Sequence, residues 1–147
     1  MKTISNDIFF AHVESEIREG RSVRFKVKGN SMYPLLRNNR DEVTVSPYNC
    51  KPEKMDLVLF RYKGMHVLHR IIAVEGNKYI IQGDGIYSSK EQCAVKDIVG
   101  YVSAIHKKGK CRMKTSSLFY KIICRLWYSL RFCRRYLIYA LRLVYPY

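Results

Sequence analysis

One serine occupies a position that suits a catalytic nucleophile. Ser31 follows a Gly-Asn turn and precedes a Met-x-Pro sequence in the stretch VKGNSMYPLL, residues 27 to 36. A serine hydroxyl is a weak nucleophile until a base takes its proton, so catalysis by Ser31 requires a histidine or lysine within reach. A third group usually orients that base. The alternative role for Ser31 is to cap the short segment that follows it.

Two histidines in the stretch MHVLHRIIAV are candidates for the base. Side chains alternate between the faces of a strand, so His66 and His69 point to opposite sides. His69 shares its face with Val67 and Ile71, whereas His66 shares its face with Arg70. An imidazole on an apolar face is neutral or hydrogen-bonded, and a neutral imidazole can accept a proton from serine. We therefore expect His69 to be the base, with a hydrogen-bonded core histidine as the alternative.

Three motifs in this order resemble those of one peptidase superfamily. GNSMYP with Ser31, VLHRI with His69 and QGDG with Asp84 are similar to the motifs of the signal peptidase superfamily, which includes the LexA-like self-cleaving proteins. The resemblance covers about residues 23–106, and a histidine base is the pattern of the archaeal and endoplasmic reticulum signal peptidases. It implies a serine endopeptidase that processes leader or precursor peptides. In it, Ser31 would be the nucleophile, His69 the general base and Asp84 the acid that orients His69.

The chain departs from this family at the third catalytic position. Members of the histidine type have further acids shortly after the Gly-Asp sequence, where this chain has Ser89 and Lys90. Glu91 is therefore a second candidate for the orienting acid, and Asp84 has a purely structural role in a Gly-Asp-Gly turn as its alternative. The family also implies that the Ser31 backbone N–H stabilises the oxyanion and that substrate binds extended beside the strand leading to Ser31.

The distribution of apolar residues predicts a mainly β fold. Alternating or fully apolar stretches, separated by Gly, Pro and Asn, indicate five or six short strands. We expect these strands at residues 22–28, 42–47, 56–62, 65–74, 78–82 and 97–105. Together with the resemblance, this pattern predicts a signal peptidase or LexA-like coiled β-sheet, or partial barrel, with a short N-terminal helix and a C-terminal amphipathic helix. The expected divisions are an N-terminal helix over 1–22, a peptidase-like β domain over 23–110 and a helical tail over 111–147.

The predicted helical tail over 111–147 is strongly basic. The chain has a formal charge of +15, and its residues 111–147 contain eight Lys and Arg and no Asp or Glu. Apolar residues in this segment recur at helical spacing from Phe119 to Val144, alongside Trp127 and several tyrosines. Charges interrupt it too often for a membrane span, which needs about 20 apolar residues. We expect peripheral membrane contact through residues 115–147, with packing on the β domain or self-association as alternatives.

Composition and motifs also limit the other function classes. The five cysteines lack the paired spacing of a metal site or a disulfide framework, so we expect no metal, no cofactor and a reducing compartment. The N-terminal residues lack a recognisable signal peptide, and we expect a cytoplasmic protein on the cytoplasmic membrane. Too few residues precede the first core strand for a helix-turn-helix, so we do not expect nucleic acid as a partner. The competing hypothesis is a basic binding module or an inactive peptidase fold that binds a membrane surface or nucleic acid.

Overall fold

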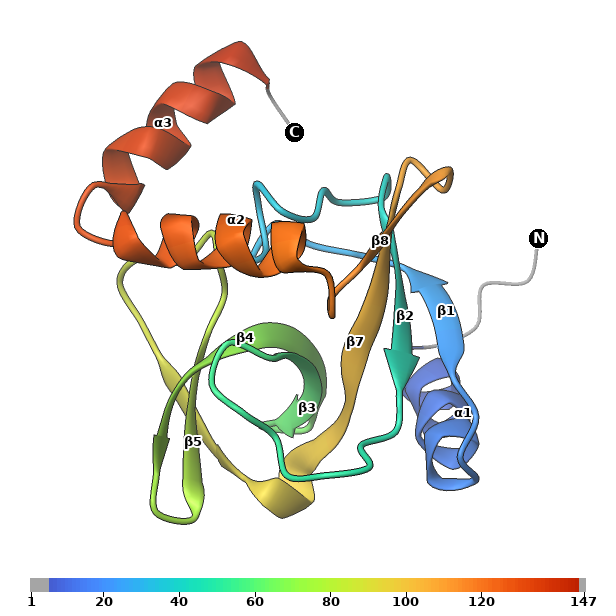
Figure 1. Ribbon diagram of the computed structural model, residues 1–147. Coiled ribbons are helices and arrows are strands. Elements are labelled where there is room, and N and C mark those ends of the chain that lie inside the picture. Colours follow the sequence, from blue (N-terminus) through green and yellow to red (C-terminus); the bar gives the residue numbers. More distant parts are fainter. Residues whose placement is uncertain (1–5, 146–147) are drawn as a thin grey trace.

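The computed structural model of the protein describes residues 6–145 and is mainly β, as predicted (Figure 1). It contains one antiparallel sheet of eight strands curled into a half-barrel, one helix near the N-terminus and two near the C-terminus. The elements are α1 (Asn6–Arg18), β1 (Val23–Lys26), β2 (Glu42–Ser46), β3 (Leu57–Tyr62), β4 (Met65–Glu75), β5 (Lys78–Gln82), β6 (Glu91–Ala94), a 3-10 turn (Val95–Asp97), β7 (Ile98–Lys107), β8 (Cys111–Lys114), α2 (Leu118–Ser129) and α3 (Arg134–Val144).

The strand order is β1-β2-β7-β3-β4-β5-β6, and β8 pairs with β7 beside this path. All six strands expected from the sequence are present. Strands β4 and β5 form a hairpin around Gly76 and Asn77, in which Glu75 pairs with Lys78. Strands β6 and β8 were not predicted. Their sequences, EQCA and CRMK, are short, and only half of their residues are apolar. They are extended because they pair with β5 and β7 respectively.

Apolar side chains cover both faces of the curled sheet. One cluster joins α1 and α2 to the strands and includes Val13, Val45, Leu59 and Tyr120. The other lies on the opposite face and is formed by Val58, Phe60, Ile71, Tyr79, Ile81 and Cys93. The two buried clusters account for the continuous apolar sequence of β3, in which consecutive residues are buried on alternate faces.

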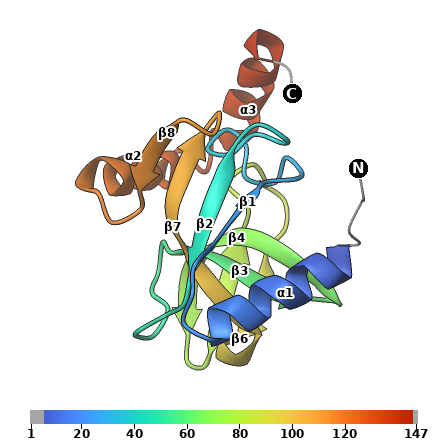
Figure 2. The same ribbon diagram turned by 90° about the vertical axis from the view of Figure 1, so that its right-hand side faces the viewer.

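The prediction of one C-terminal helix is wrong, because α2 ends at Ser129 and α3 begins at Arg134. The segment between them contains no Gly or Pro that could have indicated the break. Helix α2 is capped by Ser117, whose Oγ accepts the Tyr120 N–H at 3.2 Å. Figure 2 shows that α3 projects from the end of the molecule opposite to α1. Among residues 6–145, no helix is long and apolar enough to cross a membrane.

Candidate active site

The Ser31 side chain is partly exposed on the turn that follows β1. Gly29 allows this turn because its φ of 89° lies in the region that only glycine adopts readily. Its N–H donates to Asn38 Oδ1 at 2.9 Å, and Tyr33 N–H donates to the Asn30 carbonyl at 3.1 Å. No hydrogen bond between described residues uses the Ser31 N–H. That N–H can therefore donate to a bound group.

The loop over residues 83–86 lies directly against the Ser31 turn. Gly85 N–H donates to the Ser31 carbonyl at 2.8 Å. A Cβ on Gly83 would overlap that same carbonyl oxygen and would lie 3.1 Å from His69 Nε2. A Cβ on Gly85 would lie 2.8 Å from the Tyr33 carbonyl oxygen. Both positions require glycine, because the backbone of the 83–86 loop lies against the backbone of the Ser31 turn and leaves no room for a Cβ.

The imidazole of His69 has the orientation that a general base acting on Ser31 would need. The residue is 4% exposed on β4, and its Nδ1 lies 3.2 Å from a carboxylate oxygen of Glu91 on β6. Because a carboxylate only accepts hydrogen bonds, Nδ1 carries the proton and Nε2 is left with a free lone pair. Nε2 and the Ser31 carbonyl both lie against the single position where a Gly83 Cβ would be. The structure therefore brings Ser31 and His69 together across Gly83.

Burial lowers the pKa of His69, while the charge and hydrogen bond of Glu91 and, more weakly, the charge of Asp84 oppose this effect. The net shift favours the neutral imidazole, which is the form that can accept a proton near neutral pH. Among the described residues, no hydrogen bond joins His69 to Ser31. Such contacts are often long in ligand-free enzymes and shorten when substrate binds.

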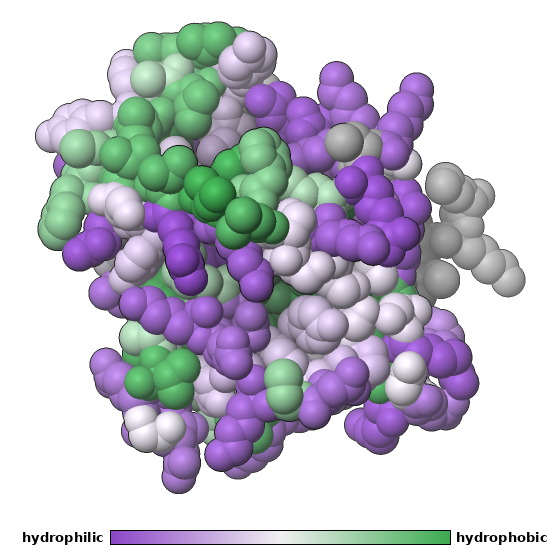
Figure 3. Space-filling view, in the orientation of Figure 1, coloured by the Kyte–Doolittle hydropathy of each residue, from purple (hydrophilic) through white to green (hydrophobic). Residues whose placement is uncertain are grey.

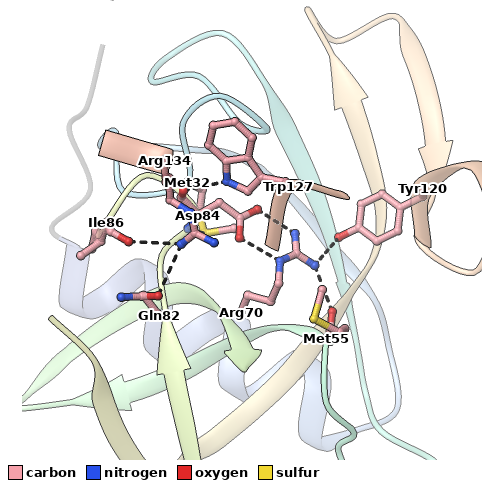
Figure 4. A network of polar contacts seen from close by, with 9 residues as sticks. All are labelled: Met32, Met55, Arg70, Gln82, Asp84, Ile86, Tyr120, Trp127 and Arg134. Carbon is pink, nitrogen blue, oxygen red and sulfur yellow. Dashed lines mark hydrogen bonds and ion pairs between the residues drawn. The ribbon is translucent and has the colours of Figure 1, made fainter. Parts of the chain in front are cut away.

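Asp84 forms an ion pair with Arg70 rather than a hydrogen bond with His69 (Figure 4). Arg70 Nε donates to one Asp84 carboxylate oxygen and a terminal nitrogen to the other, both at 2.8 Å. Both side chains are buried, so neither charge has water to compensate for loss of the other. The same guanidinium donates to the Met55 carbonyl at 3.0 Å and to the Tyr120 hydroxyl at 3.2 Å. Asp84 thus fixes the 83–86 loop to β4 and α2.

The C-terminal helices hold the other side of this loop. Trp127 Nε1 on α2 donates to the Asp84 carbonyl at 2.9 Å. Arg134 at the start of α3 donates to the Gln82 side-chain oxygen at 3.4 Å and to the Ile86 carbonyl at 3.3 Å. These contacts place both helices beside the candidate site.

The other three histidines lie elsewhere, and His12 is exposed on α1. His66 faces α1, where its Nε2 lies 2.6 Å from Glu14 and its ring stacks on Phe10 at 4.6 Å. His106 shares a hydrogen bond of 2.9 Å with Thr44. No group of three or more His, Cys, Asp or Glu residues among those described could hold a metal ion. Of the histidines in the described range, His69 is the one next to the serine turn.

Sequence reasoning selected Ser31, His69 and Asp84, with Glu91 as the alternative acid, but it did not indicate the residues that hold the 83–86 loop in place. The sequence placed Arg70 on the same face of its strand as His66 and indicated no partner for it. Arg70 pairs with Asp84 because β4, which contains the His-Arg motif, lies beside β5, which leads to the Gly-Asp motif. Trp127 and Arg134 come from the tail, where aromatic and basic residues have so many exposed neighbours that no sequence signal distinguishes them.

Comparison with known proteins adds no assignment: no family model matches the chain, and no curated protein matches it.

Proposed function

We propose that the protein is a serine endopeptidase of the signal peptidase-like type, with Ser31 as nucleophile, His69 as general base and Glu91 as the acid that orients His69. The observation that supports this most strongly is the placement of His69, whose Nδ1 is held by Glu91 while its Nε2 lies beside the Gly83 position that also contacts Ser31. The resemblance of the GNSMYP, VLHRI and QGDG motifs to the signal peptidase and LexA-like superfamily supports the same activity and a fold of that type.

The proposed reaction proceeds through an acyl-enzyme. Ser31 Oγ attacks the scissile carbonyl carbon, its proton passes to His69 Nε2, and the Ser31 N–H stabilises the oxyanion. His69 then donates that proton to the leaving amine as the C–N bond breaks, which leaves an ester on Ser31. A water molecule attacks the ester after giving a proton to His69, and the proton returns to Ser31 as the carboxylic product leaves. Glu91 stays ionised and keeps His69 in the required tautomer.

The strand that leads to Ser31 offers a place for an extended substrate. Strand β1 is at the end of the sheet and pairs only with β2 among the described strands, so its other edge can hydrogen-bond to a peptide. Beside it is a hollow of about 450 Å³ whose apolar lining includes Phe25, Val27, Leu59 and Leu68. From β4, Leu68 and His66 line this hollow, which would accept an apolar side chain of a peptide bound along β1.

A second candidate function is peptide binding without catalysis, because no hydrogen bond joins Ser31 to His69 among the described residues. The edge of β1 and the adjoining hollow would serve this function equally well. The two functions differ in one outcome only, which is whether the bound peptide bond is broken.

Cleavage of a diverse peptide library, followed by mass spectrometry of the new termini, tests the proposal. The wild-type protein is expected to produce a consistent set of termini, and Ser31→Ala and His69→Gln to produce none. Ser15→Ala and His12→Ala are matched controls, because both residues are exposed on α1 and distant in the chain from the candidate site motifs. Library cleavage that persists in Ser31→Ala would refute the assignment. If the wild type binds library peptides but does not cleave them, the binding function is favoured.

A further inference from the structure

Helix α2 packs on the protein through one face, and its opposite, outward face is also apolar. The packed face contains Tyr120 and Cys124, which are 4% and 5% exposed. Five large residues, at helical spacing on the other side, are exposed: Phe119, Ile122, Ile123, Leu126 and Leu130. Phe132, in the turn after α2, is 81% exposed. The apolar stripe seen in the sequence is thus the side of α2 that does not pack.

Helix α3 is arranged in the same way. Arg134 and Ile138 are buried against the protein, while Tyr136, Tyr139 and Leu143 are exposed on the opposite side. Figure 3 shows hydrophobic side chains gathered over α2 and α3 on one face of the molecule, bordered by hydrophilic residues. We define the tail patch as the exposed apolar residues of this region: Leu118, Phe119, Ile122, Ile123, Leu126, Leu130, Phe132, Tyr136, Tyr139, Leu143, Val144 and Tyr145. Exposed apolar surface of this extent on one face usually marks a binding site.

Basic residues accompany this patch and acids do not. Lys121 and Arg125 on α2, Arg131 in the turn and Arg135 on α3 are exposed. None of these four forms an ion pair with an acid in the described part of the chain. Since residues 111–147 contain no Asp or Glu, their field is not cancelled locally. Successive turns of each helix place the basic residues along a flank of the apolar stripe.

We propose that the tail patch docks on the surface of an anionic lipid membrane, with its apolar residues in the headgroup region and its Lys and Arg residues against acidic headgroups. Exposed large apolar side chains flanked by uncompensated positive charge are the features that bind such a surface. A bilayer containing acidic lipids complements both the apolar stripe and the positive charge beside it. The helices are already folded and fixed by Tyr120, Trp127 and Arg134, so docking requires no ordering of the tail.

This docking does not depend on whether Ser31 is catalytic. If the proposed function also holds, the contacts of Trp127 and Arg134 with the 83–86 loop put the candidate site next to the docked helices. Substrate would then be taken from the membrane surface.

Sedimentation with lipid vesicles tests the proposal using the full chain. We expect binding to phosphatidylcholine vesicles that contain phosphatidylserine, and much weaker binding to phosphatidylcholine alone. The triple variant R125Q/R131Q/R135Q removes three charges, and it should lower the partition coefficient on the acidic vesicles by about 100-fold at low salt. The variant F119S/L126S/L143S keeps every charge and should lower it at least tenfold on the same vesicles.

Matched controls make equal changes elsewhere on the surface. K78Q/K90Q/K96Q removes three exposed lysines outside the tail, and M65S/V74S/V95S replaces three exposed apolar residues outside the tail. Both should bind acidic vesicles like the wild type, apart from the small effect of total charge. Near-ultraviolet circular dichroism and the emission of Trp127, the single tryptophan, show whether each variant keeps its fold.

The competing occupants predict other results. Binding that survives F119S/L126S/L143S, or that soluble glycerophosphoserine displaces completely, would mean simple anion binding and would overturn the proposal. Absence of vesicle binding by the folded wild type would overturn it as well. If the wild type also forms dimers in sedimentation equilibrium that F119S/L126S/L143S abolishes, the tail patch is a self-association surface instead.

Discussion

The Nδ1 atom of His69 lies 3.2 Å from a Glu91 carboxylate oxygen, although the Gly-Asp motif had indicated Asp84 as the orienting acid. Glu91 reaches His69 because β6 pairs with β5 and β5 with β4. The two carboxylate oxygens of Asp84 instead each accept a hydrogen bond from Arg70. The two acids therefore have different partners: Glu91 contacts His69, whereas Asp84 pairs with Arg70 and holds the 83–86 loop.

Glu91→Gln separates the charge of this acid from its shape. Glutamine can present either an oxygen or an NH₂ group to His69, so the tautomer of the imidazole is no longer fixed. We expect the rate of Ser31 acylation to fall by about 10²- to 10⁴-fold, as when a triad loses its acid. Time courses of labelling with a serine-reactive reagent measure this rate. Glu75→Gln, at an exposed site, is the control. An unchanged rate in Glu91→Gln would remove Glu91 from the mechanism.

The pH dependence of acylation follows from the environment of His69. Burial lowers its pKa below the ordinary value of 6.5 despite the opposing charge of Glu91. The active form is the neutral imidazole, so the rate should hold its plateau as pH falls through 6.5 and decline only at lower pH. The midpoint should move further towards acid in Glu91→Gln, because that variant loses the charge that raises the pKa. A wild-type midpoint above 6.5 would contradict this account of His69.

Gly83→Ala tests the contact between the loop and the serine turn. The added methyl group would overlap the Ser31 carbonyl oxygen and crowd His69 Nε2, so the turn or the loop must move. We expect acylation to be lost and stability to fall by about 1–3 kcal/mol, as in other overpacked sites. Gly76→Asn is the control, because nothing lies near its Cβ position and asparagine tolerates positive φ. Full activity in Gly83→Ala would show that this close contact is not required.

A double-mutant cycle on Arg70 and Asp84 measures what their ion pair contributes. Each single change, Arg70→Met or Asp84→Leu, leaves one buried charge without its partner and should destabilise the fold by about 3–5 kcal/mol. The double variant R70M/D84L should cost clearly less than the sum of the two, because no unpaired charge remains. Urea unfolding of all four proteins gives the coupling. Additive effects would mean that the pair does not secure the loop.

Asp41 gives a stability prediction that is independent of the candidate site. Its burial raises the carboxyl pKa, but hydrogen bonds from Arg40 and from the Arg37 and Lys108 backbone, with the charge of Lys107, lower it to about 2 from 3.8. A depressed pKa stabilises the fold above the unfolded value, and that contribution of about 2 kcal/mol is lost as pH falls from about 4 to 2. Asp41→Asn should lose it at pH 7 and show a flatter stability profile in that range. Asp7→Asn, on the exposed face of α1, should match the wild type.

Much of the fold could be predicted from the sequence because its strands alternate in polarity and are separated by Gly, Pro and Asn. Strands β6 and β8 could not, since EQCA and CRMK become strands only through their partners. The break between α2 and α3 also depends on tertiary contacts, in which Arg134 turns towards Gln82 and Ile86. Helical spacing located the apolar stripe of the tail but not which face would pack.

Ser31 and His69 could be selected from local motifs and strand alternation, both of which are properties of short segments. The choice between Asp84 and Glu91 could not be made in this way, because it depends on the register of β4, β5 and β6 and on Arg70 as a competing partner. Strand register is a long-range property that no single stretch contains.

Covalent labelling with a fluorophosphonate, located by mass spectrometry, tests the central claim that Ser31 is an activated nucleophile. The account predicts a single adduct on Ser31 in the folded protein, which is absent from Ser31→Ala, suppressed in His69→Gln and unchanged in Ser15→Ala. A parallel sample that contains vesicles with phosphatidylserine tests whether labelling requires a membrane surface. A folded protein that remains unlabelled with and without lipid, or an adduct on Ser31 that forms equally well in His69→Gln, would contradict the account.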